Sequence, residues 1–78
     1  MNLPFYKEIQ KNAKEKFIIE SKEYKGNKFI DVRVFYEDEF GKVHPTKKGI
    51  AISYHKIPEI VESIIEAVEY EGLDSTVR

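Results

Sequence analysis

Apolar and polar residues alternate over two segments in the first half of the chain, a pattern typical of β-strands with one wetter face. Residues 17–24 follow this alternation, and residues 29–36 follow it with many β-branched and aromatic side chains. The residues between them include Gly26 and Asn27, which tolerate positive φ and favour a turn. The two segments therefore predict an antiparallel hairpin.

Two further strands are predicted after this hairpin. Residues 38–41 favour a turn, and residues 42–44 begin a short third strand. Pro45 is expected to stop that strand, because proline donates no hydrogen bond to a strand ladder. Residues 46–49 then form a loop, and residues 50–54 form the fourth strand.

The periodicity changes to that of an amphipathic helix near the C-terminal end of the chain. Pro58 suits the first helical turn and Gly72 the position just after the last one, so a helix is predicted over residues 57–71. Its glutamates lie on the solvent side. Its apolar face consists of Ile57, Ile60, Val61, Ile64, Ile65 and Val68.

These elements predict a single α+β domain over residues 1–78: a four-stranded antiparallel curved β-sheet followed by one C-terminal α-helix. The sheet is expected within residues 13–56, the helix at 57–71 and a tail at 72–78. Residues 1–12 are uncertain, and either a short helix or an extension of the first strand fits them. The helix is expected to cover one face of the sheet. The other face would then carry Lys22, Tyr24, Asp31 and Arg33, together with the hairpin tips.

A chain of 78 residues buries only a thin core, and this one has no cysteine with which to form a disulfide. A second copy would supply the missing buried area. Dimerisation is therefore expected.

The charges are unevenly distributed although the net charge is only −1. Residues 1–56 hold twelve of the thirteen Lys and Arg and eight of the fourteen Asp and Glu, a net charge of +4. The remaining residues carry −5. Such asymmetry hides a basic surface behind a nearly neutral total, and it is compatible with nucleic-acid binding.

Several classes of chemistry find no support in the sequence. His44 and His55 have no further nitrogen or sulfur ligand at metal spacing, and the acidic residues 37–39 fit a solvated turn better than a magnesium site. No nucleophile motif and no phosphate-cradling glycine loop is present. We expect no enzyme, no metal and no cofactor.

The sequence also gives no sign of a membrane or secreted protein. No apolar run approaches the about 20 residues that cross a bilayer, and residues 1–6 have no signal-peptide pattern. We expect a cytoplasmic or nucleoid location.

A curved sheet whose open face mixes aromatic and basic side chains suits single-stranded nucleic acid, because bases stack on rings and cations contact phosphates. Arg33 and Tyr36 differ in strand parity, so both reach one ligand only if the strand bends. Other roles remain open: a turn residue for Tyr24, a core residue for Tyr36 and a solvated loop for the lysine pair. The candidate stacking residues are Tyr24 and Tyr36, and the candidate phosphate contacts are Lys22, Lys25, Lys28, Arg33, Lys47 and Lys48.

Four motifs follow one another at fixed spacing: EYKGNKFIDVR at residues 23–33, YED at 36–38, Gly41, and PTKKGIAI at 45–52. In this they resemble the positive cofactor four family of transcriptional coactivators. The resemblance implies a four-stranded antiparallel sheet with one helix, a symmetric homodimer, and binding of single-stranded or unwound DNA with little sequence preference. We expect the helices to help form the interface of this dimer. The compact form is similar to that of bacterial, archaeal and phage relatives.

The resemblance also assigns the candidate residues individually. Tyr24 and Lys25 match the aromatic and basic residues of the family's turn, Arg33 matches its strand arginine, and Tyr36 matches its second aromatic residue. Two departures weaken the expected phosphate contact: Asn27 replaces a turn lysine, and the basic position before Pro45 is His44. The remaining basic matches are Lys22, Lys47 and Lys48.

We therefore expect a protein that binds single-stranded DNA, such as a transcription coactivator or an accessory protein of replication, recombination or repair. Two alternatives remain open. The acidic helix is compatible with a protein-interaction module that docks transcription or replication proteins. An RNA chaperone is compatible with the same groove, because stacking and phosphate contacts do not depend on the sugar.

Overall fold

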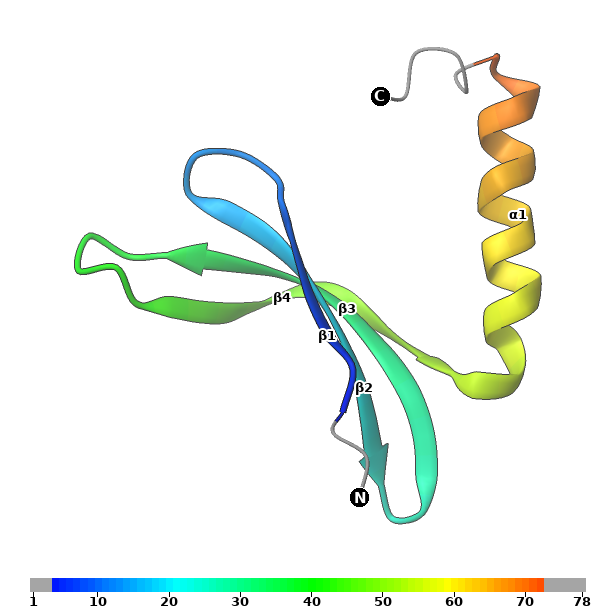
Figure 1. Ribbon diagram of the computed structural model, residues 1–78, viewed down its shortest axis with the longest axis horizontal. Coiled ribbons are helices and arrows are strands. Elements are labelled where there is room, and N and C mark those ends of the chain that lie inside the picture. Colours follow the sequence, from blue (N-terminus) through cyan, green and yellow to red (C-terminus); the bar gives the residue numbers. More distant parts are fainter. Residues whose placement is uncertain (1–3, 73–78) are drawn as a thin grey trace.

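The computed structural model describes residues 4–72 as a curved four-stranded antiparallel sheet followed by a helix (Figure 1). The strands lie side by side in chain order, and each is joined to the next by a hairpin. This arrangement confirms the predicted α+β class. The elements are β1 (Tyr6–Gln10), β2 (Glu15–Tyr24), β3 (Asn27–Glu37), β4 (Val43–Ser53), a 3-10 helix η1 (Tyr54–Lys56) and α1 (Ile57–Tyr70).

The four strands are not the four that the pattern predicted. The third and fourth predicted strands form one strand, β4, which continues through Pro45 and through the expected loop at 46–49. Pro45 is tolerated because β4 is an edge strand, where a missing N–H group can face away from the sheet. The prediction that Pro45 ends a strand was therefore wrong, as was the placement of Tyr54 in a strand.

The missing strand comes from the N-terminal segment that the sequence left uncertain. β1 pairs antiparallel with β2, with Ile9 opposite Phe17. Every residue of β1 is exposed, which explains why its pattern gave a weak signal. At the other end of the chain α1 stops at Tyr70, and the expected tail lies outside the described residues except for Gly72.

The turn between β2 and β3 contains only two residues, Lys25 and Gly26, and it is tighter than predicted. Both have positive φ, +51° and +81°, as in the type I′ turns that suit the twist of a hairpin. Tyr24 and Asn27 close the hairpin as cross-strand partners. The turn therefore holds Tyr24 at the very end of β2 and Lys25 at the tip.

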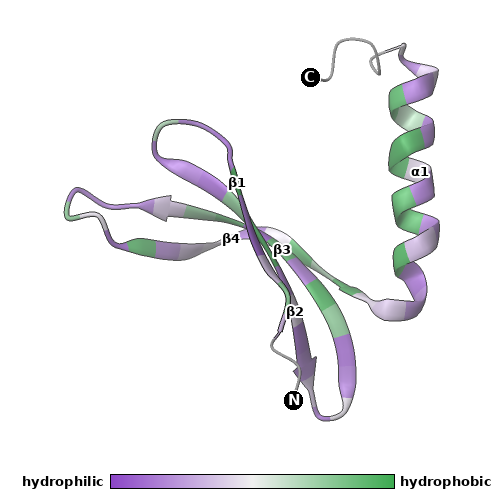
Figure 2. Ribbon diagram, in the orientation of Figure 1, coloured by the Kyte–Doolittle hydropathy of each residue, from purple (hydrophilic) through white to green (hydrophobic). Residues whose placement is uncertain are grey.

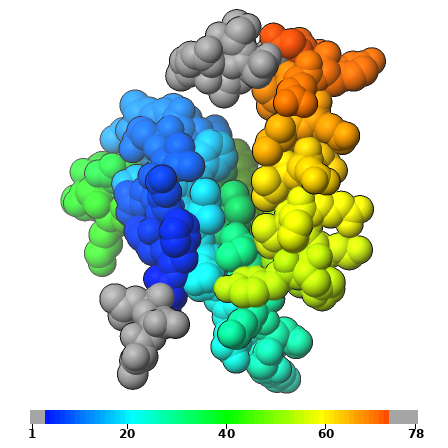
Figure 3. All heavy atoms as spheres, turned by 45° about the vertical axis from the view of Figure 1, so that its right-hand side comes forward, coloured from blue at the N-terminus to red at the C-terminus, as the bar shows by residue number. Residues whose placement is uncertain are grey.

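Helix α1 does not cover the sheet, contrary to the expectation from sequence. None of its side chains is buried, and its main contact is with η1 (Figures 1 and 3). The 3-10 turn leads the chain off the end of β4, so the apolar stripe of α1 has no facing sheet within one chain. Apolar and polar segments alternate along the helix (Figure 2). It is also not long and apolar enough to cross a membrane.

The core of the single chain is correspondingly small. Ile18 and Val34, 2% and 7% exposed, are the only buried hydrophobic residues within the described range 4–72. Three residues of the helix stripe, Val61, Ile64 and Ile65, are 48%, 59% and 53% exposed. Among the described residues, many more large hydrophobic side chains are thus exposed than buried.

The strand register sorts the side chains onto two faces of the sheet. The apolar face contains Phe17, Ile19, Ile30, Val32, Val34, Ile50 and Ile52. The opposite face, here called the charged face, contains Lys16, Ile18, Glu20, Lys22 and Tyr24 of β2 with Phe29, Asp31, Arg33 and Phe35 of β3.

Candidate nucleic-acid interface

An ion-pair network occupies the centre of the charged face. Asp31 is only 3% exposed, and it is the single buried polar residue among those described. Arg33 donates to both of its carboxylate oxygens, from Nε at 3.2 Å and from Nη2 at 3.0 Å. The Nζ atom of Lys22 lies 3.5 Å from the Asp31 carboxylate and 3.7 Å from that of Glu20. The network fixes two of the predicted phosphate contacts, Lys22 and Arg33, on one face.

The network keeps its charges at neutral pH. Burial alone raises the pKa of Asp31, but the hydrogen bond from Arg33 and the positive charges of Lys22 and Arg33 lower it more strongly. The same hydrogen bond raises the pKa of Arg33. Asp31 and Arg33 therefore remain an ion pair over the physiological range.

A register shift between Arg33 and Phe35 ties the lysine pair to this network. The Nη1 atom of Arg33 donates to the Thr46 carbonyl at 3.0 Å, and Thr46 Oγ1 donates to the carbonyl of Val34 at 2.7 Å. The backbone N–H of Lys48 donates to Thr46 Oγ1 at 3.1 Å. Lys47 and Lys48 thus lie in an ordered bulge of β4 rather than in the predicted loop.

Gly49 allows β4 to lie close to Arg33. The two residues are cross-strand partners, and a Cβ at position 49 would lie 2.9 Å from the Cβ of Arg33 and 2.8 Å from a backbone carbonyl of β3. Any larger residue would therefore displace the strand that positions the guanidinium group.

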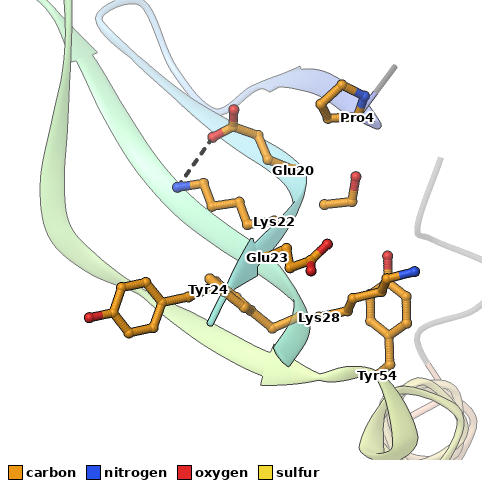
Figure 4. A pocket seen from close by; sticks show the side chains of 9 residues that line it. Pro4, Glu20, Lys22, Glu23, Tyr24, Lys28 and Tyr54 are labelled. Atoms are coloured by element: carbon orange, nitrogen blue, oxygen red, sulfur yellow. Dashed lines mark ion pairs between the residues drawn. The ribbon is translucent and has the colours of Figure 1, made fainter. Parts of the chain in front are cut away.

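The hairpin tip carries a second group of candidates. The Tyr24 side chain is 65% exposed, and the Nζ atom of Lys25 lies 5.4 Å from the centre of its ring. Lys28 is opposite Glu23 in the register, so it belongs to the other face of the sheet. Figure 4 shows Tyr24 and Lys28 extending to opposite sides of the hairpin. The structure therefore groups Tyr24 with Lys22 and Arg33, and it separates Lys28 from them.

Tyr36 lies at the other end of β3 and stacks on a histidine. Its ring is 5.1 Å from that of His44, at an interplanar angle of 27°, and Tyr36 is 43% exposed. The Nε2 atom of His44 lies 2.7 Å from an oxygen of Asp38, whose other oxygen accepts the N–H groups of Phe40 and Lys42. The ring is thus supported by the turn while part of it stays accessible.

The carboxylate of Asp38 makes this support dependent on pH. Its contact with His44, followed by the N–H group of Lys42, lowers its pKa below the ordinary value. Because the pKa of Asp38 is lower in the folded state than in the unfolded chain, the ionised carboxylate stabilises the fold at pH values above the unfolded pKa of about 3.9. This stabilisation is lost as the pH falls through the pKa of the folded state.

We predict that Asp38→Asn lowers the melting temperature at pH 7, and that the difference from the unsubstituted protein shrinks below about pH 4. Asparagine can still accept the backbone hydrogen bonds of the turn, so this variant isolates the carboxylate charge. Thermal unfolding followed by circular dichroism between pH 7 and pH 3 measures the effect. A difference that is the same at both ends of this range would contradict the assignment.

The two tyrosines are far apart along β3. Nine residues separate Asn27, the partner of Tyr24, from Tyr36, which corresponds to about 30 Å of strand. The β2–β3 pairing is unbroken through Glu15 and Tyr36, so Tyr36 lies on the face of the sheet opposite Arg33, and the register shift between Arg33 and Phe35 adds its extra residues to β4. A bend in β3 that would let Arg33 and Tyr36 reach one ligand therefore stays a prediction.

Lys48 also lies towards the Tyr36 end. The hydrogen bond from Asn12 lowers the pKa of Glu15 most, and the charge of Lys48 acts in the same direction. Glu15 is the cross-strand partner of Tyr36. Along β4, Lys48 thus lies between Gly49, the partner of Arg33, and His44, the partner of Tyr36.

Three residues that support the candidate site were not predicted from the sequence: Asp31, Thr46 and His44. Asp31 was placed on the open face without a role, although its position two residues before Arg33 puts both on one side of a strand. The contacts of Thr46 and His44 depend on the β3–β4 register, for which the sequence gave no signal.

Comparison with known proteins identifies relatives of this fold. The family model of the transcriptional coactivator p15 (PC4) matches residues 11–63. A PC4 homologue from Burkholderia pseudomallei is 28% identical, with a TM-score of 0.72 over 78% of this chain and 82% of its own. In a second crystal form, the same homologue is 26% identical, with a TM-score of 0.74 over 83% of this chain and 97% of its own.

A more distant structure shares the fold alone. The bacteriophage T5 homologue of PC4, implicated in recombination-dependent DNA replication, is 16% identical, with a TM-score of 0.75 over 95% of this chain and 86% of its own. No curated protein sequence matches the chain closely enough to indicate a relationship.

Proposed function

Because this chain belongs to the transcriptional coactivator p15 (PC4) family, we propose that it binds single-stranded or unwound DNA with little sequence preference. The observation that carries the proposal is the arrangement of the charged face. A fixed arginine lies at its centre, an exposed aromatic ring lies at the hairpin end, and a lysine-bearing bulge adjoins it. Transcription, replication, recombination or repair would then be the process served.

Phosphate binding would be divided between two kinds of cation. Arg33 has two N–H groups beyond the three that donate to Asp31 and Thr46 within the described chain, and a phosphate can accept both. Lys25, Lys47 and Lys48 take part in no ion pair described for residues 4–72, so their charges are available to displace counterions from DNA.

Base stacking would supply the rest of the affinity. Tyr24 presents an exposed ring at the end of the hairpin, and Tyr36 presents a partly exposed ring supported by His44. Stacking on a ring is tolerant of sequence because every base has a flat π face. To meet both rings, a strand of DNA would have to pass from the charged face to the side of β3 on which Tyr36 lies.

We propose that the functional unit is a homodimer. The helix stripe is half-exposed, and Ile9 and Ile50 at the edges of the apolar face are 45% and 56% exposed. Burial of apolar area contributes about 25 cal/mol per Å². A chain whose described residues 4–72 include two buried hydrophobic residues needs such a contribution. A second copy presents the same stripe and completes a closed, two-fold interface.

Fluorescence anisotropy with a labelled strand of ~20 nucleotides tests the proposal, since that length spans one or two binding folds. We expect binding that weakens as salt rises and that resists competition by duplex DNA of the same sequence. A matched RNA strand as competitor separates DNA from RNA preference. No binding at low salt would contradict the proposal and favour a protein-interaction module that uses the acidic helix.

Lys48→Ala is predicted to reduce the slope of log affinity against log salt by about one unit at most. The side chain is exposed and belongs to the bulge of β4 next to Arg33, so its loss would remove one phosphate contact without disturbing the core. Lys7→Ala is the matched control, because Lys7 pairs with Ile19 and so lies on the opposite face. Equal slopes for both variants would exclude Lys48 from the interface.

A further inference from the structure

We propose that Asp31 is a positioning residue for DNA binding, whose buried carboxylate holds Arg33 and Lys22 in the orientation in which they meet phosphate. The inference rests on the proposed function and names a residue on which that site depends. Asp31 itself is 3% exposed, so it is not placed to contact DNA directly. It would act through the two cations that it binds.

The position of Asp31 is unfavourable for a carboxylate that served stability alone. It is directly opposite Glu20 in the β2–β3 register, and like charges opposite each other destabilise a sheet. Lys22 offsets the repulsion by lying within 3.7 Å of both carboxylates. Well-packed apolar residues usually stabilise a fold at least as well as a buried ion pair. The Asp31 carboxylate can orient Arg33 through hydrogen bonds, which an apolar residue at this position could not do.

The contacts of Arg33 fix its plane as well as its location. Asp31 accepts from Nε and Nη2, and the Thr46 carbonyl accepts from Nη1, so all three guanidinium nitrogens are held. Two N–H groups remain, and the side chain is 26% exposed. The two remaining N–H groups of Arg33 are therefore already ordered before a ligand binds. Binding then costs less conformational entropy, which favours it.

The sign of the expected effect separates positioning from simple charge. Glu20, Lys22, Asp31 and Arg33 together carry no net charge. If charge alone determined affinity, removal of the Asp31 charge would strengthen the binding of a polyanion. If Asp31 positions Arg33, the same removal weakens it.

The test compares Asp31→Asn with Glu20→Gln in the anisotropy assay with single-stranded DNA. Each variant removes one negative charge from facing positions on the same surface, but only the first breaks the paired contact with Arg33. We expect Asp31→Asn to weaken binding about tenfold or more, and Glu20→Gln to leave it unchanged or slightly tighter. A folded Asp31→Asn variant that binds as well as the unsubstituted protein, or better, would overturn the inference.

Arg33→Lys tests the same contact if Asp31→Asn does not fold. Lysine keeps the charge and loses the planar pair of donors. We expect the loss of affinity seen with Asp31→Asn, and no further loss when the two substitutions are combined. Affinity like that of the unsubstituted protein would show that charge suffices and would overturn the positioning role. If the unsubstituted protein itself does not bind DNA, the proposed function fails. That outcome differs from the one in which the unsubstituted protein binds and the variants bind equally well, which overturns only the positioning role.

Discussion

Ile64→Glu is expected to abolish the dimer and to lower the free energy of unfolding by more than about 3 kcal/mol. Ile64 is 59% exposed in the single chain and lies in the apolar stripe of α1. If the chain functioned alone, a substitution at so exposed a position would change stability by about 0.5 kcal/mol or less. If the stripe is the dimer interface, a charge is buried against apolar side chains, and the thin core of each copy loses its support.

Sedimentation measures the mass of the assembly, and thermal unfolding at several protein concentrations measures its stability. Unfolding of a dimer depends on concentration, and that dependence should disappear in the variant. Glu62→Ala is the matched control, because position 62 is about 160° around the helix from Ile64. A stable dimer of Ile64→Glu would exclude the helix stripe from the interface.

The elements that could be predicted from the sequence are those with local causes. The helix follows from a 3.6-residue repeat bounded by Pro58 and Gly72, and its observed end at Tyr70 differs from the prediction by one residue. The β2–β3 hairpin follows from alternation on both sides of Gly26. In each case the pattern of adjacent residues sets both the element and its limits.

The elements that could not be predicted depend on long-range pairing. Pro45 lies within β4 only because that strand is at the sheet edge and shifts its register opposite Arg33 and Phe35. β1 exists because it pairs with β2, and its five exposed residues give little sign of this by themselves. The prediction that the helix covers the sheet was wrong. The apolar stripe of a helix shows that it needs a partner surface, but it does not show which surface that is.

The candidate site shows the same division. The sequence singled out Tyr24, Lys25 and Arg33 as candidates from a motif, and the hairpin places Tyr24 and Arg33 on one face of the sheet with Lys25 at the tip. Lys28 was also a candidate phosphate contact, and the two-residue turn puts it in register with Glu23 on the other face, so its role stays a prediction. The face on which Lys28 lies thus depends on the length of the turn. Turn propensities showed roughly where the turn is, but not how many residues it contains.

Tyr24→Ala is expected to weaken binding of single-stranded DNA by about 1–3 kcal/mol, and Tyr36→Ala is expected to weaken it by a similar amount. The rings are about 30 Å apart along β3, so they would stack on different bases of one strand. Changes at such separated sites usually add, so the double variant should lose the sum of the two energies. Anisotropy titrations of the single and double variants measure these values.

The phenylalanine variants at both positions are the matched controls, because they keep the ring and lose only the hydroxyl group. They should bind nearly as well as the unsubstituted protein. The outcome for Tyr36 decides between two roles, since its ring already stacks on His44. If Tyr36→Ala lowers stability but leaves the affinity of the folded protein unchanged, Tyr36 is a support of the β3–β4 hairpin and the strand stacks only on Tyr24. If affinity falls as well, the strand passes from the charged face to the second ring, and the interface extends from the hairpin tip past the bulge of β4.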